Sequence, residues 1–381
     1  MNFSLSAIPD IKFGPHAFDD IAALAKPLCG NGKAAIVMDS FLANSGLGEK
    51  LASLLRMEGI AAEIFSDFAG EPKLSHVRKA GAAAKGKSLV IGVGGGSALD
   101  IAKIAACTAA SGEDPMFYAL AANPLPHNPL KKIMVPTTAG TGSETSATNI
   151  FAGPEGKKLW IWGAETKADL VILDPALTVS LPANMTAWCG IDAFIHAFEA
   201  STNRNANPAG KLFGHEGMRL IAANLVRAVT EPADLAARGN VLLGSCYGGV
   251  AIDNCGTAIA HNISHAMAGL APIHHGHATA LGFEVSLPWL VAADTDNLKE
   301  AASALGLRSA ADIPPFVTRL MDDCDVIRSL PNAFATFSAV DLAREMRAAE
   351  NQPMRRSTAR EVTDADIDIF AAAIMKLNKG N

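Results

Sequence analysis

The feature that most constrains the fold is an alternation in the first 180 residues between short apolar runs and amphipathic stretches. This pattern is typical of β-α units stacked around a mostly parallel sheet. The predicted strands cover residues 33–39, 61–65, 88–93, 132–135 and 168–173, with a hairpin over residues 148–162. After Pro182, long Ala-, Leu- and Met-rich segments keep helical periodicity. We therefore predict an α/β domain over residues 1–180 and a helical domain over residues 181–381.

Composition excludes several classes of protein. The chain has 381 residues with 49% hydrophobic and 18% charged side chains, which argues for a folded globular protein. Apolar stretches stop well short of the roughly 20 residues that a membrane span needs. A net charge of −6 argues against nucleic acid as a partner. The N-terminus lacks a signal-peptide pattern, and the six cysteines form no CxxC pair, so we expect a cytoplasmic protein with reduced thiols.

Two small-residue turns follow neighbouring predicted strands. The first, GGGSALD at residues 94–100, opens a predicted helix, and its glycines would let the backbone approach a pyrophosphate closely. The second, PTTAGTGSE at residues 136–144, offers hydroxyls and amides. A glycine turn can also serve close packing alone. Two such turns at adjacent strand ends favour a nucleotide, because ligands of open α/β sheets bind at the carboxyl ends of strands.

An acidic residue, Asp39, ends the first strand of that pattern. Its carboxylate can accept hydrogen bonds from ribose hydroxyls and would repel a 2′-phosphate, which favours NAD over NADP. Position alone equally allows Asp39 to act as the N-cap of the following helix.

Seven of the ten histidines fall between residues 196 and 277, in an otherwise apolar helical region. Asp192 and His196 are four apart, so a helix places both on one face. His261 and His265 repeat this spacing, and His275 follows in a Pro/Gly-containing segment that we expect to be a loop. Imidazoles combined with a carboxylate suit Fe²⁺ or Zn²⁺ better than Mg²⁺. A single helical histidine is commonly a core residue, but two such pairs and a third cluster indicate a metal site.

These motifs, in this order, resemble the iron-containing (group III) alcohol dehydrogenases over nearly the whole chain. The matching segments are KFGPHA, GGGSALD, PTTAGTGSE, LDPALTVSLP, GIDAFIHAFEA, the block at residues 261–276 and NQPMRR. The resemblance implies an N-terminal dinucleotide-binding α/β domain and an all-α C-terminal domain, an architecture shared with dehydroquinate synthase. It also implies a homodimer.

The resemblance assigns site residues by position. The metal ligands would be Asp192, His196, His261 and His275, while His265 would move protons without binding the metal. The cofactor residues it points to are Asp39, Gly95, Gly96, Ser97, Asp100, Thr137, Thr138, Thr141 and Lys158.

The function these expectations describe is reversible hydride transfer between a primary alcohol, or its aldehyde, and NAD(H). The metal would be Fe²⁺, with Zn²⁺ as the alternative, and would acidify the alcohol. His265 would relay the hydroxyl proton.

Other functions remain open at this point. A glycerol-dehydrogenase-like zinc enzyme acting on secondary alcohols would lack the second helical ligand, so His196 argues against it. A maleylacetate-reductase-like enzyme would act on an anionic substrate, and Arg355 and Arg356 are candidates for binding one. A dehydroquinate-synthase-like lyase would need lysines and arginines around the metal, and these are scarce near residues 192–277. A non-catalytic metal- or nucleotide-binding protein is the last alternative.

Overall fold

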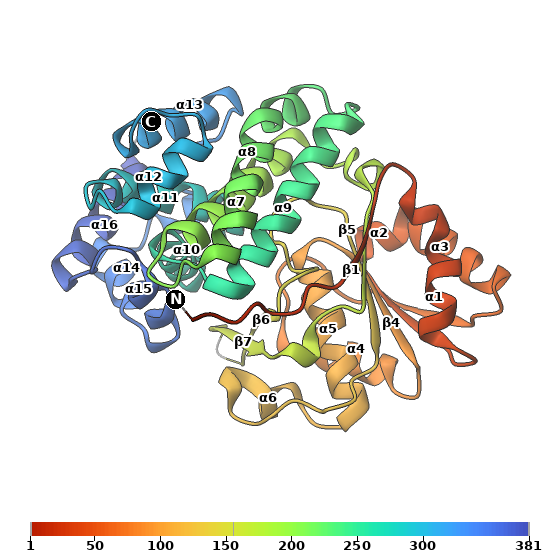
Figure 1. Cartoon of the computed structure of the whole chain (residues 1–381). Coiled ribbons are helices and arrows are strands. Elements are labelled where there is room, and N and C mark those ends of the chain that lie inside the picture. Colours follow the sequence, from red (N-terminus) through yellow and green to blue (C-terminus); the bar gives the residue numbers. More distant parts are fainter. Residues whose placement is uncertain (1, 155, 380–381) are drawn as a thin grey trace. The chain divides into compact units, whose positions relative to one another are not determined.

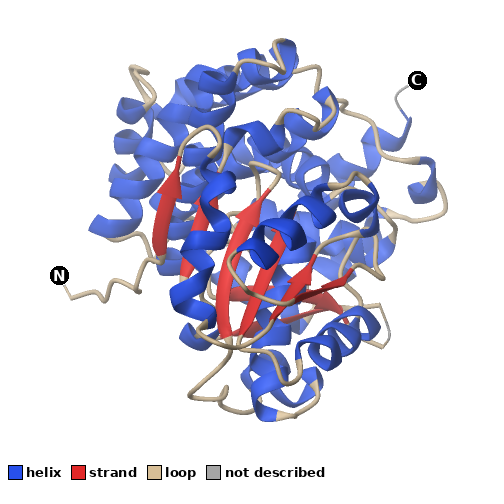
Figure 2. Cartoon of the chain, turned by 90° about the vertical axis from the view of Figure 1, so that its right-hand side faces the viewer, coloured by secondary structure: helices blue, strands red, loops and turns tan. Residues whose placement is uncertain are grey.

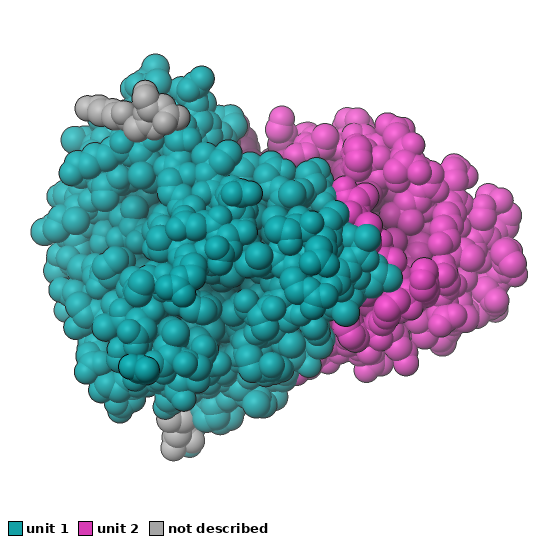
Figure 3. All heavy atoms as spheres, turned by 90° about the horizontal axis from the view of Figure 1, so that it is seen from above, with its two compact units in different colours: residues 1–5, 139–141, 181–381 teal, residues 6–138, 142–180 magenta. Residues whose placement is uncertain are grey.

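The computed structural model describes residues 2–154 and 156–379 and divides the chain into two compact units. Residues 6–138 and 142–180 form the first, here called the α/β unit. The described parts of residues 1–5, 139–141 and 181–381 form the second, here called the helical unit. Figure 3 colours the two units separately. No helix among the described residues has both the length and the apolar character needed to cross a bilayer.

A six-stranded parallel sheet forms the centre of the α/β unit (Figure 2). Its strands are β1 (Asp10–Phe13), β2 (Ala34–Val37), β3 (Ala62–Phe65), β4 (Leu89–Gly94), β5 (Lys131–Pro136) and β8 (Leu170–Leu173), in the order β1-β8-β5-β4-β2-β3. A separate antiparallel pair consists of β6 (Thr148–Ala152) and β7 (Lys158–Trp162). These elements confirm the predicted parallel α/β architecture.

Helices connect the strands of the sheet. They are α1 (Ile21–Cys29), α2 (Ser40–Asn44), α3 (Leu47–Met57), α4 (Leu74–Ala84), α5 (Gly96–Ser111) and α6 (Pro115–Tyr118). Apolar residues of α1 and α3 belong to the same buried hydrophobic cluster as alternate residues of the strands, such as Ile36, Ile91 and Ile133. Every residue of β2, β4 and β8 is buried. Strands covered on both faces have continuous apolar sequences, which explains the apolar runs at these three strands.

Two features of the α/β unit differ from the sequence expectation. We predicted one helix after the first apolar strand, but Gly46 adopts φ +88° and separates α2 from α3, because glycine pays no Cβ penalty in this region. Strand β1 was not predicted. It lies at the sheet edge, is mostly exposed and pairs only with β8, so its sequence lacks an apolar run.

The helical unit contains ten helices among the described residues (Figure 1). They are α7 (Ala183–Thr202), α8 (Pro208–Thr230), α9 (Leu235–Cys255), α10 (Ile259–Leu270), α11 (His275–Val291), α12 (Asp296–Ala304), α13 (Ile313–Asp323), α14 (Ala339–Met346), α15 (Gln352–Ser357) and α16 (Asp364–Lys376). α7, α8 and α9 pack against one another, and α10 packs against α11. Thr363 is the N-cap of α16, and its side chain accepts a hydrogen bond from the backbone N–H of Asp366.

The Pro/Gly-containing segment at His275, which we expected to be a loop, starts a helix. His275 is the first residue of α11, and His274 is its N-cap. The stretch at residues 351–360 includes α15, whose proline lies in the first helical turn, where no backbone N–H is needed. Pro272 and Gly276, which flank His275, explain the expectation of a loop there.

Candidate metal centre and nucleotide site

Three helices of the helical unit bring together the four residues expected to bind a metal. Asp192 and His196 lie one turn apart on α7, His261 lies in the first turn of α10, and His275 begins α11. Each offers one ligand atom, and these four atoms all lie within 4.8 Å of one another. This arrangement is a donor set of one carboxylate and three imidazoles.

Hydrogen bonds orient two of the imidazoles. His196 donates from Nδ1 to the carbonyl oxygen of Gly140 at 3.2 Å, an acceptor that cannot donate in return. His261 donates from Nδ1 to the carboxylate of Glu199 at 2.6 Å. Both rings therefore present the Nε2 lone pair as the free ligand. Their planes stack with centroids 4.5 Å apart.

Asp192 lies at the middle of this group and is 2% exposed. Its Oδ1 is 3.7 Å from Nε2 of His261 and 3.7 Å from Nε2 of His275, and it accepts no hydrogen bond from the described residues. Burial lowers the pKa of His196, which keeps that imidazole in the neutral form that a metal requires.

A glycine allows α11 to approach α7 at this point. A Cβ added to Gly276 would lie 2.4 Å from the carbonyl oxygen of Trp188 and 3.3 Å from the Cβ of Asp192. Only a residue without a side chain fits between these two helices, so Gly276 sets the distance between His275 and Asp192.

The remaining histidines of this region have other neighbours. His265 lies one turn beyond His261 on α10, half-buried, with its ring centroid 5.7 Å from that of His275. His274 and His277 both pack on the indole of Trp188, and His277 donates from Nε2 to the carbonyl oxygen of Ile327. His265 thus lies next to the four-residue group, whereas His277 is held by a backbone carbonyl.

The glycine-rich turn of the α/β unit lies at a reversal of strand order. β2 is followed in the chain by β3 on one side and then by β4 on its other side. Open α/β sheets bind ligands at the carboxyl ends of strands at such a point. Gly94 adopts φ +148°, and a Cβ there would lie 3.7 Å from the Oδ2 of Asp39. The end of β2 and the start of α5 therefore meet at this turn.

The predicted cofactor residues divide into two groups in the structure. Gly95 is the N-cap of α5, and Gly96 and Ser97 form its first turn, half-exposed, with their backbone N–H groups at the positive end of the helix. A Cβ on Gly95 would contact Thr138 at 3.4 Å, and the backbone N–H of Thr137 donates to the Gly94 carbonyl. These five residues surround one turn.

The other predicted cofactor residues have structural contacts or lie elsewhere. The carboxylate of Asp100 accepts from Ser143 Oγ and from the backbone N–H of Ile150, and it lies 3.7 Å from the buried Nζ of Lys103. Lys158 forms an ion pair with Glu71 at 3.2 Å. Thr141 belongs to the helical unit. Asp39 accepts from the N–H of Leu42 and so caps α2.

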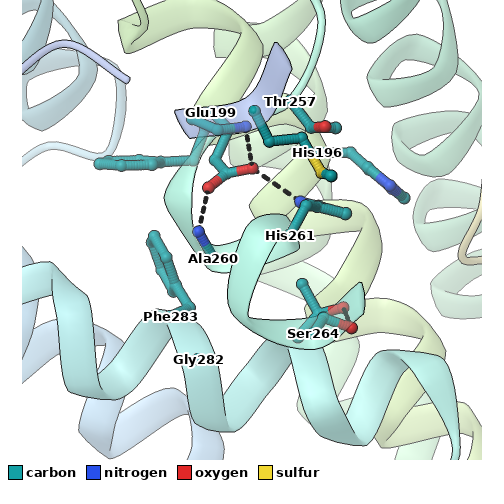
Figure 4. A network of polar contacts seen from close by, with 12 residues as sticks. His196, Glu199, Thr257, Ala260, His261, Ser264, Gly282 and Phe283 are labelled. Atoms are coloured by element: carbon teal, nitrogen blue, oxygen red, sulfur yellow. Dashed lines mark hydrogen bonds and ion pairs between the residues drawn. The ribbon is translucent and has the colours of Figure 1, made fainter. Parts of the chain in front are cut away.

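Sequence reasoning gave no role to Glu199, whose carboxylate accepts a hydrogen bond from the candidate ligand His261 (Figure 4). The residue lies three positions after His196 on α7 and is 1% exposed. Its spacing from Asp192 and His196 puts it on the same helix face, and a buried acid in that pattern was the available signal.

The arginine pair considered for an anionic substrate has a local explanation. Arg355 donates from Nε to the Val362 carbonyl and forms an ion pair with Asp364 at 2.8 Å, whereas Arg356 is exposed. Arg355 thus fastens α15 to the start of α16.

Comparison with known proteins gives a consistent result across the chain. Residues 9–175 match the family described as iron-containing alcohol dehydrogenase, and residues 186–372 match the C-terminal part of the Fe-containing alcohol dehydrogenase family. Long-chain-alcohol dehydrogenase 1 of Geobacillus thermodenitrificans is 35% identical over 78% of this chain and 76% of its own length.

Two further relatives cover most of the chain. Sulfoacetaldehyde reductase of Bilophila wadsworthia is 32% identical over 87% of this chain and 89% of its own length. A crystal structure of 1,3-propanediol oxidoreductase superimposes with a TM-score of 0.87 at 28% identity, covering 99% of this chain and 100% of the other. The predicted fold class, an α/β part with a parallel sheet followed by a helical part, is confirmed. The chain belongs to the iron-containing alcohol dehydrogenase family and is an oxidoreductase.

Proposed function

We propose that Asp192, His196, His261 and His275 hold a single divalent metal, Fe²⁺, for interconversion of a primary alcohol and its aldehyde. The observation that carries the proposal is the convergence of four buried or half-buried ligand atoms within 4.8 Å of one another. Zn²⁺ is the alternative metal, since its affinity for such ligands exceeds that of Fe²⁺.

The residues fit such a metal. Ligand atoms about 2.0–2.2 Å from a tetrahedral metal lie roughly 3.4 Å from one another. The two Asp192 Oδ1 to Nε2 distances of 3.7 Å therefore need only small adjustments. The buried Oδ1 of Asp192, which accepts no hydrogen bond within the described chain, would gain a partner. A metal that expands beyond four ligands would keep a position for a substrate oxygen beside three protein nitrogens and one protein oxygen.

The proposed NAD site is the turn between β4 and α5. Backbone N–H groups of Gly95, Gly96 and Ser97 would bind the pyrophosphate, with Thr137 and Thr138 beside them. Asp39 would accept hydrogen bonds from the ribose hydroxyls and select NAD. We also propose Asp100, Thr141 and Lys158 as cofactor-binding residues. The hydrogen bonds that Asp100 accepts from Ser143 and Ile150 support a further role, which is to hold residues 143–150 against α5.

A bound divalent metal supplies a Lewis acid that lowers the pKa of an alcohol and polarises an aldehyde. NAD bound at the proposed turn would supply a hydride acceptor, and NADH a hydride donor. His265 is the group proposed to accept the hydroxyl proton during oxidation and to return one during reduction, because imidazole titrates near neutral pH. Its half-buried position beside His275 supports this role.

The experiment is metal analysis of anaerobically purified protein, combined with NADH and NADPH oxidation on a panel of small aldehydes before and after Fe²⁺ or Zn²⁺ loading. We expect near-stoichiometric metal and faster turnover with NADH. Protein that takes up no metal under any loading condition would refute the ligand assignment.

A second experiment separates His265 from the ligands. His265→Ala is expected to lower kcat while leaving the bound metal unchanged. Loss of metal from this variant would instead make His265 a ligand, which contradicts the proposed proton transfer role.

We also propose a cytoplasmic homodimer. A reducing compartment is supported by the six cysteines, all of which are buried free thiols. The dimer is supported by the family resemblance, and light scattering on the purified protein tests it.

A further inference from the structure

We propose that Glu199 is a positioning residue that couples the start of α10 to the orientation of the metal ligand His261. The inference rests on the metal site proposed above and deepens it. Glu199 does not belong to the four-residue group, so it would act through His261 and through the backbone of α10.

The N-terminus of α10 lacks a cap of its own. Its N-cap residue is Ala258, which has no side chain able to accept a hydrogen bond. A helix start leaves backbone N–H groups without intrahelical partners, and buried ones are costly unless another group accepts them. Both Ala258 and Ala260 are buried at this helix start.

Glu199 supplies the missing cap from another helix. Its Oε2 accepts from the N–H of Ala258 at 2.7 Å, and its Oε1 accepts from the N–H of Ala260 at 2.7 Å. The negative carboxylate also lies at the positive end of α10, where charge is stabilised. Figure 4 shows this carboxylate between α7 and the first turn of α10.

The same carboxylate sets the tautomer of the ligand. Oε2 accepts a third hydrogen bond, from Nδ1 of His261 at 2.6 Å. A proton held on Nδ1 leaves the Nε2 lone pair for the metal, and the nearby negative charge makes the imidazole a stronger donor.

Glutamine is the sharpest replacement, because it keeps the shape and removes the charge and one acceptor. In the Glu199→Gln variant the amide oxygen can still accept from Ala258 and His261, but the amide NH₂ then faces the N–H of Ala260. Two donors in contact disturb the first turn of α10, which carries His261. Ser201→Ala is the matched control, since the buried Ser201 hydroxyl lies on the same helix and, among the described residues, donates to the α7 carbonyls of Ala197 and Phe198.

The test is Co²⁺ binding to metal-free wild type, Glu199→Gln, Glu199→Asp and Ser201→Ala, well below their unfolding temperatures. We expect Co²⁺ affinity to fall roughly 10- to 100-fold in Glu199→Gln, with a changed visible spectrum of the bound ion. Glu199→Asp, which keeps the charge, should lie between Glu199→Gln and wild type, and Ser201→Ala should match wild type.

The following results would contradict the proposed role of Glu199. A Glu199→Gln protein that melts at a lower temperature but binds Co²⁺ with wild-type affinity and spectrum would make Glu199 a helix cap only. Should Glu199→Gln fail to fold, unchanged Co²⁺ binding by Glu199→Asp overturns the inference in its place. A wild-type protein that binds no Co²⁺ would overturn the proposed metal site itself, and the inference with it.

Discussion

The two units of this chain use opposite means to build their proposed sites. In the α/β unit the turn after β4 offers mainly backbone N–H groups, and its side chains are small. In the helical unit the group on α7, α10 and α11 consists of side chains from distant parts of the sequence. A backbone site depends on local conformation at a few glycines, whereas a side-chain site depends on how helices pack. The two should therefore fail in different ways when mutated.

The largest expected effect separates the two sites. His275→Ala removes a proposed ligand and should weaken metal binding by more than the roughly 10- to 100-fold that losing an outer partner costs. NAD affinity, which we propose to come from the turn after β4 in the α/β unit, should stay at the wild-type value. Metal analysis and NADH titration measure both quantities, with the exposed His127→Ala as control. A parallel loss of NAD affinity would contradict the separation.

The second prediction compares the buried acids of the two units. Asp192 is surrounded by imidazoles, whereas Glu144 is a buried acid of the α/β unit whose Oε1 accepts no hydrogen bond from the described residues. Burial raises the pKa of Glu144 from 4.5 to about 7. Between these pH values the folded protein holds a proton that the unfolded chain has lost, so stability falls as pH rises.

The loss is complete above pH 7 and amounts to about 3 kcal/mol, at roughly 1.4 kcal/mol per pKa unit. Glu144→Gln cannot ionise and avoids this loss. Urea unfolding at pH 4.5 and pH 8 should show the variant gaining stability over wild type mainly at the higher pH. An equal difference at both pH values would show that the carboxyl is not neutral in the folded protein.

The third prediction compares a glycine from each site. Gly276→Ala would place Cβ 2.4 Å from a backbone oxygen of Trp188, so α11 must move away from α7. We expect a loss of about 1–3 kcal/mol of stability, as overpacking usually costs, together with weaker metal binding. Gly95→Ala meets Thr138 only at 3.4 Å. It should keep stability to within about 1 kcal/mol and lose NAD affinity.

Thermal melts and titrations with metal and NADH distinguish these two variants. A Gly276→Ala protein with wild-type metal affinity would show that the spacing of α7 and α11 does not control metal binding by the four-residue group.

The smallest expected effect concerns the choice between NADH and NADPH at the proposed NAD site of the α/β unit. Asp39→Asn keeps an oxygen to accept from Leu42 and so preserves the cap of α2, but it removes the charge. The ratio of kcat/KM for NADPH to that for NADH should rise roughly tenfold, which corresponds to about 1.4 kcal/mol. Steady-state kinetics with both cofactors measure it. An unchanged ratio would leave Asp39 with the capping role alone.

Much of the α/β unit was predictable because its signals are local. The apolar runs that became β2, β4 and β5 are buried on both faces, and glycines mark the turn after β4. The edge strand β1 escaped prediction because a single partner and exposed faces leave no hydrophobic pattern. The break at Gly46 escaped because a positive φ cannot be told from an ordinary helical glycine by periodicity.

The sequence by itself determined which residues are candidate ligands of the metal site. Helical spacing placed Asp192 and His196 on one face, and the histidine pattern, read through the family resemblance, named the candidate ligands. Only the tertiary structure decided how these side chains are held. Gly276 lies against Trp188, and Glu199 accepts hydrogen bonds from the start of α10. Both contacts are between residues far apart in the chain. Periodicity records which side of a helix is buried, but the partner it meets depends on how the helices pack.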